Sequence, residues 1–174
     1  MRIPTVAFTL AVGVALTLSM VTACDDDDDL IGIIEDAEFI VPVMGGGFER
    51  PDPVASEGSG RAFFEFDDDN DEMNFRVEVE DIQDVTLAHI HFGDEGVAGP
   101  IVVELFNDGG SPEDFEERDV LAEGSFEEDD IDDDSGITTM DELLEAMEAG
   151  DTYVNVHTTT NPAGEIRGQI APVN

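Results

Sequence analysis

Three histidines are the residues of this 174-residue chain whose type and spacing are best suited to chemistry. His89 and His91 stand two positions apart, and His157 lies in a second segment, Tyr153-Val154-Asn155-Val156-His157-Thr158. Alternate side chains of an extended strand share a face, so the first two rings should point the same way. If His157 lies on a neighbouring strand, the three imidazoles can meet. Such a cluster would be either a metal site or a polar structural motif, and the sequence leaves both open.

The metal interpretation rests on ligand chemistry. Imidazole is a good ligand for Cu and Zn, and three histidines with one open position form a workable metal geometry. In the structural alternative, the rings hydrogen-bond Asn155, Thr158 or the backbone and fix the strands. We therefore regard Cu or Zn as a candidate cofactor and require none. No nucleophile-elbow, Walker or dinucleotide pattern occurs, so we expect no catalysis.

Two further groups of charged residues have less specific patterns. Glu165 and Arg167 share a face of the last expected strand, and we expect an ion pair that sets strand register rather than a ligand site. Four acids have the spacing of calcium-loop ligands: Asp67, Asp69, Asp71 and Glu78. However, Glu72 stands where that loop needs glycine, and strands rather than helices flank it. We interpret the segment as a solvated hairpin loop.

The start of the chain has the features of a secretory signal, with Arg2 as its only charge before an apolar run over 6–21. The junction Val21-Thr22-Ala23-Cys24 resembles the lipobox of bacterial lipoproteins, in which the cysteine is diacylated and becomes the first residue. We expect a signal peptide over 1–23, lipidation of Cys24, and an acidic, extended tether over 24–36. The protein would then be held on a lipid bilayer in the cell envelope, facing the periplasm or the exterior. The alternative is an ordinary export signal with an incidental cysteine.

The charge is extreme: 44 acids stand against 6 arginines and no lysine. Removal of Arg2 with the signal would leave 5 − 44 = −39. Binding to nucleic acid needs a cationic surface and is excluded as a function class. Because 41% of residues are hydrophobic, the chain should fold rather than stay disordered. We interpret the acidity as adaptation to high salt, in which counter-ions screen self-repulsion.

The histidines must be positioned by strands of one domain, which we expect over 37–174. Period-two patterns and turn residues predict eight strands, at 38–44, 61–67, 74–82, 85–92, 101–106, 120–126, 152–159 and 165–171. Pro42 indicates that the first is an edge strand. Thr139 and Glu142 fit a capping box for one helix that ends at Gly150. We therefore expect an all-β fold, an antiparallel Greek-key, immunoglobulin-like β-sandwich with one short helix across an end.

Four motifs resemble the CHRD domain, named for chordin: Ala88-His89-Ile90-His91-Phe92-Gly93, Gly99-Pro100-Ile101-Val102, Tyr153 to Thr158, and Asn161-Pro162-Ala163-Gly164-Glu165-Ile166-Arg167-Gly168. Asn155, Glu165 and Arg167 belong to these motifs and are expected to be structural. The resemblance implies an extracellular binding or structural module, with an unknown extracellular protein or ligand as its partner. It implies no catalytic activity.

The segment from His89 to Asp94 also resembles the copper-ligand strand of copper/zinc superoxide dismutase, and His157 could match a later ligand of that family. The chain departs from that family because it has no fourth histidine and cannot form the disulfide with Cys24 alone. The sequence thus predicts a lipid-anchored extracytoplasmic binding or structural module. The alternative is a Cu- or Zn-binding protein with a three-histidine site, similar to superoxide dismutase.

Overall fold

A computed structural model describes residues 36–173. The expected signal peptide, the lipidation site Cys24 and all of the tether except Asp36 lie outside the described residues. The strands are β1 (Phe39–Gly45), β2 (Ser59–Asp67), β3 (Glu72–Glu80), β4 (Ile82–Phe92), β5 (Ile101–Asn107), β6 (Glu113–Phe115), β7 (Asp119–Phe126), β8 (Thr152–Thr158), β9 (Ile166–Gln169) and β10 (Ala171–Pro172). The helices are α2 (Met140–Ala149) and three 3-10 turns at Gly46–Phe48, Glu128–Asp130 and Asp133–Ser135. None of the described helices is long and apolar enough to cross a membrane.

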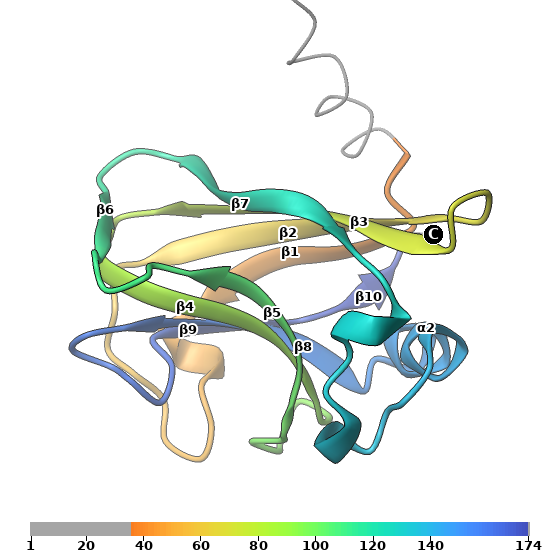
Figure 1. The fold of residues 1–174 in the computed structure, drawn as a ribbon. Coiled ribbons are helices and arrows are strands. Elements are labelled where there is room, and N and C mark those ends of the chain that lie inside the picture. Colours follow the sequence, from red (N-terminus) through yellow and green to blue (C-terminus); the bar gives the residue numbers. More distant parts are fainter. Residues whose placement is uncertain (1–35, 174) are drawn as a thin grey trace, which may run out of the picture.

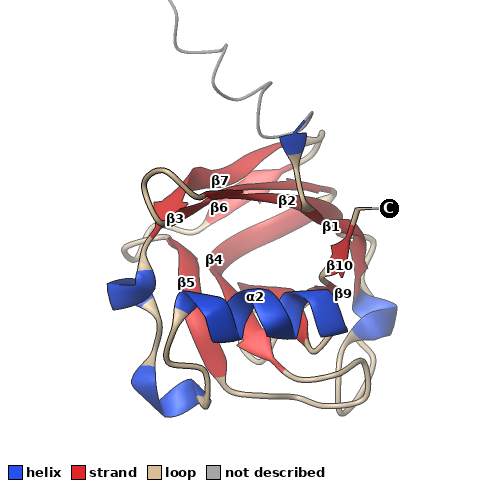
Figure 2. Cartoon of the chain, turned by 90° about the vertical axis from the view of Figure 1, so that its right-hand side faces the viewer, coloured by secondary structure: helices blue, strands red, loops and turns tan. Residues whose placement is uncertain are grey.

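The strands form one antiparallel sheet in the order β5-β4-β8-β9-β1-β2-β3-β7, with β10 paired to β1 and β6 to β4. Figure 1 shows the sheet curled on itself, with β7, β3, β2 and β1 above β5, β4, β8 and β9. The end strands β5 and β7 approach each other, so the sheet is nearly closed, like a barrel. Helix α2 crosses one end of the two layers (Figure 2). Within residues 36–173 the all-β class and the one short α-helix of the domain are confirmed, whereas the Greek-key, immunoglobulin-like topology stays a prediction.

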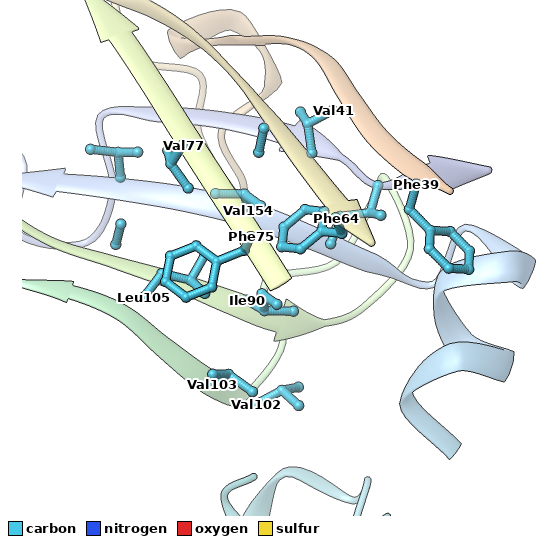
Figure 3. Packing of buried hydrophobic residues seen from close by; sticks show 14 of the residues in the cluster. Phe39, Val41, Phe64, Phe75, Val77, Ile90, Val102, Val103, Leu105 and Val154 are labelled. Carbon is cyan, nitrogen blue, oxygen red and sulfur yellow. The ribbon is translucent and has the colours of Figure 1, made fainter. Parts of the chain in front are cut away.

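The apolar core fills the space between the layers. Phe64 of β2 and Phe75 of β3 lie opposite Ile90 of β4 and Val154 of β8 (Figure 3). Most strands contribute through period-two alternation, since every second side chain points inward. Burying a large apolar side chain stabilises the fold by about 1.5–3 kcal/mol. The core therefore fixes which face of β4 and β8 is left for polar side chains.

Two expectations about the strands need correction. Strand β1 is not an edge strand, because it lies between β2 and the β9–β10 side, and Pro42 falls where the β1–β2 register shifts. A bulge accommodates proline because no ladder hydrogen bond is lost there. The segment 107–118 lies between two expected strands and was expected to be a loop, but it contains the short strand β6.

The capping box is half formed. Thr139 Oγ1 accepts a hydrogen bond from the backbone N–H of Glu142 at 3.2 Å, as expected. The Glu142 carboxylate instead accepts from the backbone and hydroxyl of Thr138, at 2.8 and 3.1 Å. Gly150 ends the helix in the left-handed region, at φ 76°.

Candidate metal centre

The candidate centre lies on the face of β4 and β8 that points away from the apolar core. Strand β8 is buried on both faces: Val154 and Val156 enter the apolar core, so Tyr153, Asn155 and His157 point to the other side. Antiparallel register extends this polar face across three strands. One row runs His89, Asn155, Arg167, and the next runs His91, Tyr153, Gln169.

The structure brings the three predicted histidines together. Nδ1 of His89 lies 3.1 Å from Nε2 of His157, and one ligand nitrogen from each of the three rings lies within 4.8 Å of the others. All three side chains are buried, between 4% and 8% exposed. Strand pairing explains the convergence, because His157 is opposite Leu87 in β4, within two residues of His89.

Backbone carbonyls fix the tautomers of two rings. Carbonyl oxygens only accept, so Nδ1–H of His91 donates to Gly99 O at 3.0 Å, and Nδ1–H of His157 donates to Pro162 O at 3.2 Å. Both Nε2 atoms therefore carry a free lone pair. The lone pair of His157 accepts from Nδ1–H of His89. Nε2 of His91 is buried and has no hydrogen-bond partner among the described residues. A buried polar atom without a protein partner is uncommon, and a water or an ion is what usually satisfies it.

Burial keeps the rings neutral. Burial first, and the neighbouring His157 and His91 rings second, lower the pKa of His89 to about 4. Burial also lowers the pKa of His91 to about 4 and shifts the pKa of His157 downward. Neutral imidazole is the form that binds a metal ion, so the cluster is ready for one at neutral pH.

The donor set fits a Cu or Zn ion. Imidazole nitrogens bind Zn at about 2.0–2.1 Å, which places tetrahedral neighbours about 3.3 Å apart. Nδ1 of His89 and Nε2 of His157 are already near this spacing. To bind an ion, Nδ1 of His89 has to lose the proton that it donates to His157, the His89 tautomer shifts to Nε2–H, and the third ring has to move closer. The ligand set holds no carboxylate: Glu104, the acid paired with the cluster, lies 4.0 Å from Nε2 of His89 and is half-exposed.

A stack of side chains stands behind His91. The rings of His91 and Tyr153 are parallel within 5°, with centroids 4.9 Å apart. Cζ of Arg167 lies 3.3 Å from the Tyr153 centroid. Since β4 and β9 lie on opposite sides of β8, the tyrosine ring lies between the imidazole and the guanidinium. The Tyr153 hydroxyl also accepts from the N–H of Gly99, the residue whose carbonyl binds His91.

The expected ion pair between Glu165 and Arg167 does not form in the described part of the chain. The Arg167 guanidinium is buried and donates to the carbonyl oxygens of Val97 and Asp94, at 2.7 and 2.8 Å. The Glu165 carboxylate accepts from three polar side chains instead: Ser56, Thr158 and Asn161. The two residues therefore hold different loops. Arg167 points toward loop 93–100, and Glu165 points toward the turn after β8.

Sequence reasoning missed one member of the site. Glu49 is only 3% exposed, and both of its carboxylate oxygens accept from Nδ2 of Asn155 at 3.1 Å. Burial raises the pKa of Glu49 to about 7. The residue sits in an expected loop among many surface acids, so no pattern in the sequence distinguishes it. Gly164 is required beside it, since a Cβ there would lie 2.5 Å from Oδ1 of Asn155.

The calcium-like spacing does not produce a site that includes all four acids. Glu78 is buried and pairs with Arg61 at 2.6 Å and Arg76 at 2.9 Å. The Asp67 carboxylate accepts from the backbone and side chain of Asn70, which closes the turn. The segment is a hairpin turn between β2 and β3.

The fold and site define an antiparallel β-domain with a buried polar cluster outside its apolar core. The family model of the CHRD domain matches residues 41–170, a span that includes every residue of this cluster. The chain belongs to the CHRD domain family, which confirms the resemblance carried by the motifs. No curated protein and no solved structure gives a match to this chain.

Proposed function

We propose that this chain is a lipid-anchored extracytoplasmic binding module of the CHRD type that holds one Cu or Zn ion. Its membership of the CHRD family supports a binding or structural role. The observation that carries the metal proposal is Nε2 of His91, which is buried and unpartnered in the described structure beside two other imidazoles. The proposal includes no catalytic step.

The ion would join two strands and one loop. His89 and His91 come from β4, His157 comes from β8, and Gly99 in loop 93–100 holds the His91 ring. An ion that binds only the folded chain adds to its stability by mass action. The centre would therefore stiffen the polar face on which loop 93–100 rests. A Greek-key, immunoglobulin-like framework and an acyl chain on Cys24 complete the proposal.

Metal titration tests this function. The full chain, purified in detergent and stripped with a chelator, is titrated with Zn(II) and with Cu(II) by calorimetry in molar salt, which suppresses loose binding to surface carboxylates. We expect one ion per chain, lost in His91→Ala. Glu148→Gln, which removes an exposed acid on α2, is the matched control and should bind as the wild type does.

Equal uptake by His91→Ala and the wild type would rule out the three-histidine centre. The histidines would then act as a hydrogen-bonded structural motif, in agreement with the alternative that the sequence leaves open. Circular dichroism of each variant distinguishes a lost ligand from a lost fold.

A further inference from the structure

We infer that the three-histidine centre selects Cu(I) over divalent ions, because a buried guanidinium, that of Arg167, stands behind one of its ligands. This inference rests on the proposed metal-binding function and names the ion that the centre prefers.

The guanidinium is placed against the centre by stacking. Arg167 is 1% exposed, its Cζ lies 3.3 Å from the centroid of Tyr153, and that ring stacks on His91 at 4.9 Å. A positive charge is therefore separated from a ligand ring by one aromatic ring. The contact is rigid, since carbonyl oxygens of Val97 and Asp94 hold the guanidinium from loop 93–100.

No carboxylate neutralises Arg167 by direct contact in the described residues. Its hydrogen bonds go to two carbonyl oxygens and to the amide oxygen of Gln169 at 3.4 Å. The carboxylates of Glu49 and Asp94 act on it only through space. Burial raises the pKa of Glu49 to about 7, so near neutral pH this acid carries only part of its charge.

The ligands bring no negative charge to offset an ion. All three are neutral imidazoles, and Glu104 is half-exposed outside the ligand set. Coulomb repulsion from Arg167 grows with the charge of the ion, so a divalent ion is opposed twice as strongly as a monovalent one. The surface acids do not reverse this in a salt-rich medium, because molar salt screens exposed charges within about 3 Å while buried pairs keep their interaction.

Copper is the metal among the candidates that can respond by changing oxidation state, because imidazole binds copper well and Cu(I) carries a single charge.

The reduction potential of bound copper tests the inference. The copper-loaded full chain is titrated with redox mediators in molar sodium sulfate, which avoids chloride binding to Cu(I). We expect the bound couple to lie above the aqueous copper couple, since this is the condition for tighter binding of Cu(I). Arg167→Gln should reduce the preference for Cu(I) by about tenfold, a fall of about 59 mV for a one-electron couple. Arg167→Lys keeps the charge and should restore most of the potential.

Arg118→Gln is the matched control, because it removes the same charge from a surface arginine that pairs with Glu80. An equal potential for Arg167→Gln and the wild type, or an equal fall in Arg118→Gln, would overturn the inference. If Arg167→Gln does not fold, the wild-type measurement decides, and a bound couple below the aqueous couple overturns it. If no ion binds the wild type, the proposed function fails. If the wild type binds Zn(II) and copper but does not prefer Cu(I), the proposed function stands and this inference alone is wrong.

Discussion

Nδ1 of His89 lies 3.1 Å from Nε2 of His157, although the two residues are 68 positions apart in the chain. The contact places a donor of β4 against an acceptor of β8 on the face that the apolar core does not use. In this contact Nδ1 of His89 carries a proton and Nε2 of His157 carries none, because the backbone already fixes the tautomer of His157. The metal-free cluster should therefore respond to pH as a unit.

The metal-free domain should lose stability as pH falls from 6.5 toward 4. Burial first, and the neighbouring rings second, hold the pKa of His89 at about 4, below the ordinary 6.5. His91 has a similarly low pKa. The unfolded chain therefore binds protons first, and one such shift corresponds to roughly 3 kcal/mol that is present above pH 6.5 and lost by pH 4. Urea unfolding across this range measures the loss, and a flat profile in the chelated protein would contradict it.

Glu49→Gln should stabilise the protein at pH 8. Burial raises the pKa of Glu49 to about 7, so the folded state holds its proton more tightly than the unfolded chain does. The wild type loses stability as pH rises from 4.5 through 7, by an upper estimate of roughly 3 kcal/mol. Glutamine stays neutral and can still accept from Asn155. Denaturant melts at pH 8 and pH 4 should show a gain that disappears at the lower value. A gain of equal size at both values would assign the effect to packing instead.

Gly164→Ala should destabilise the domain more than Gly136→Ala does. Both glycines have positive φ, at 129° and 90°, so alanine is strained at either position. At Gly136 an added Cβ meets open space, whereas at Gly164 it meets the Asn155 amide at 2.5 Å and Glu49 at 2.9 Å. We expect about 1 kcal/mol at Gly136 and at least twice that at Gly164. Thermal melts of the two variants measure the difference, and equal losses would mean that the amide moves aside freely.

Cys24→Ser should release the protein from membranes. Cys24 is the only thiol of the chain, so no other side chain can carry the thioether-linked lipid. Fractionation of cells that express the variant or the wild type measures the change. Retention of the variant in the membrane fraction would exclude the lipoprotein assignment.

Molar salt should raise the melting temperature. The expected mature charge is −39, most of it lies in the folded domain, where like charges repel, and the Debye length falls to about 3 Å at 1 M salt. Circular dichroism melts from low to molar KCl check this, with a low-charge β-domain as reference. A melting temperature that does not change with KCl would remove the high-salt interpretation.

Local patterns carried most of the fold prediction. Strand β3 was readable because Phe75, Val77 and Val79 alternate with polar residues, and all three are buried. Helix α2 begins after Thr139 and ends before Gly150, as its capping residues indicate. The two-residue spacing of His89 and His91 similarly predicted a shared face.

The remaining features depend on contacts between distant segments. Pro42 signalled an edge strand, but its bulge lies in the interior of the sheet, and no local pattern reports that. Arg167 and Glu165 are close in sequence, yet Arg167 donates to the distant loop 93–100, and Glu165 accepts from the distant Ser56 as well as from the nearby turn. Glu49 and Asn155 are 106 residues apart in the chain, and only the fold brings their side chains into contact.

Because β8 is buried on both faces, the domain has a built-in check on the register of this strand. A slip of one residue in this strand would turn Val154 and Val156 toward the polar face and send Asn155 and His157 among the apolar side chains. Apolar side chains and candidate ligands therefore alternate along one strand. Both sets reach their native surroundings only when the strand is in its native register. Stoichiometric ion uptake would therefore report the fraction of molecules with native strand register.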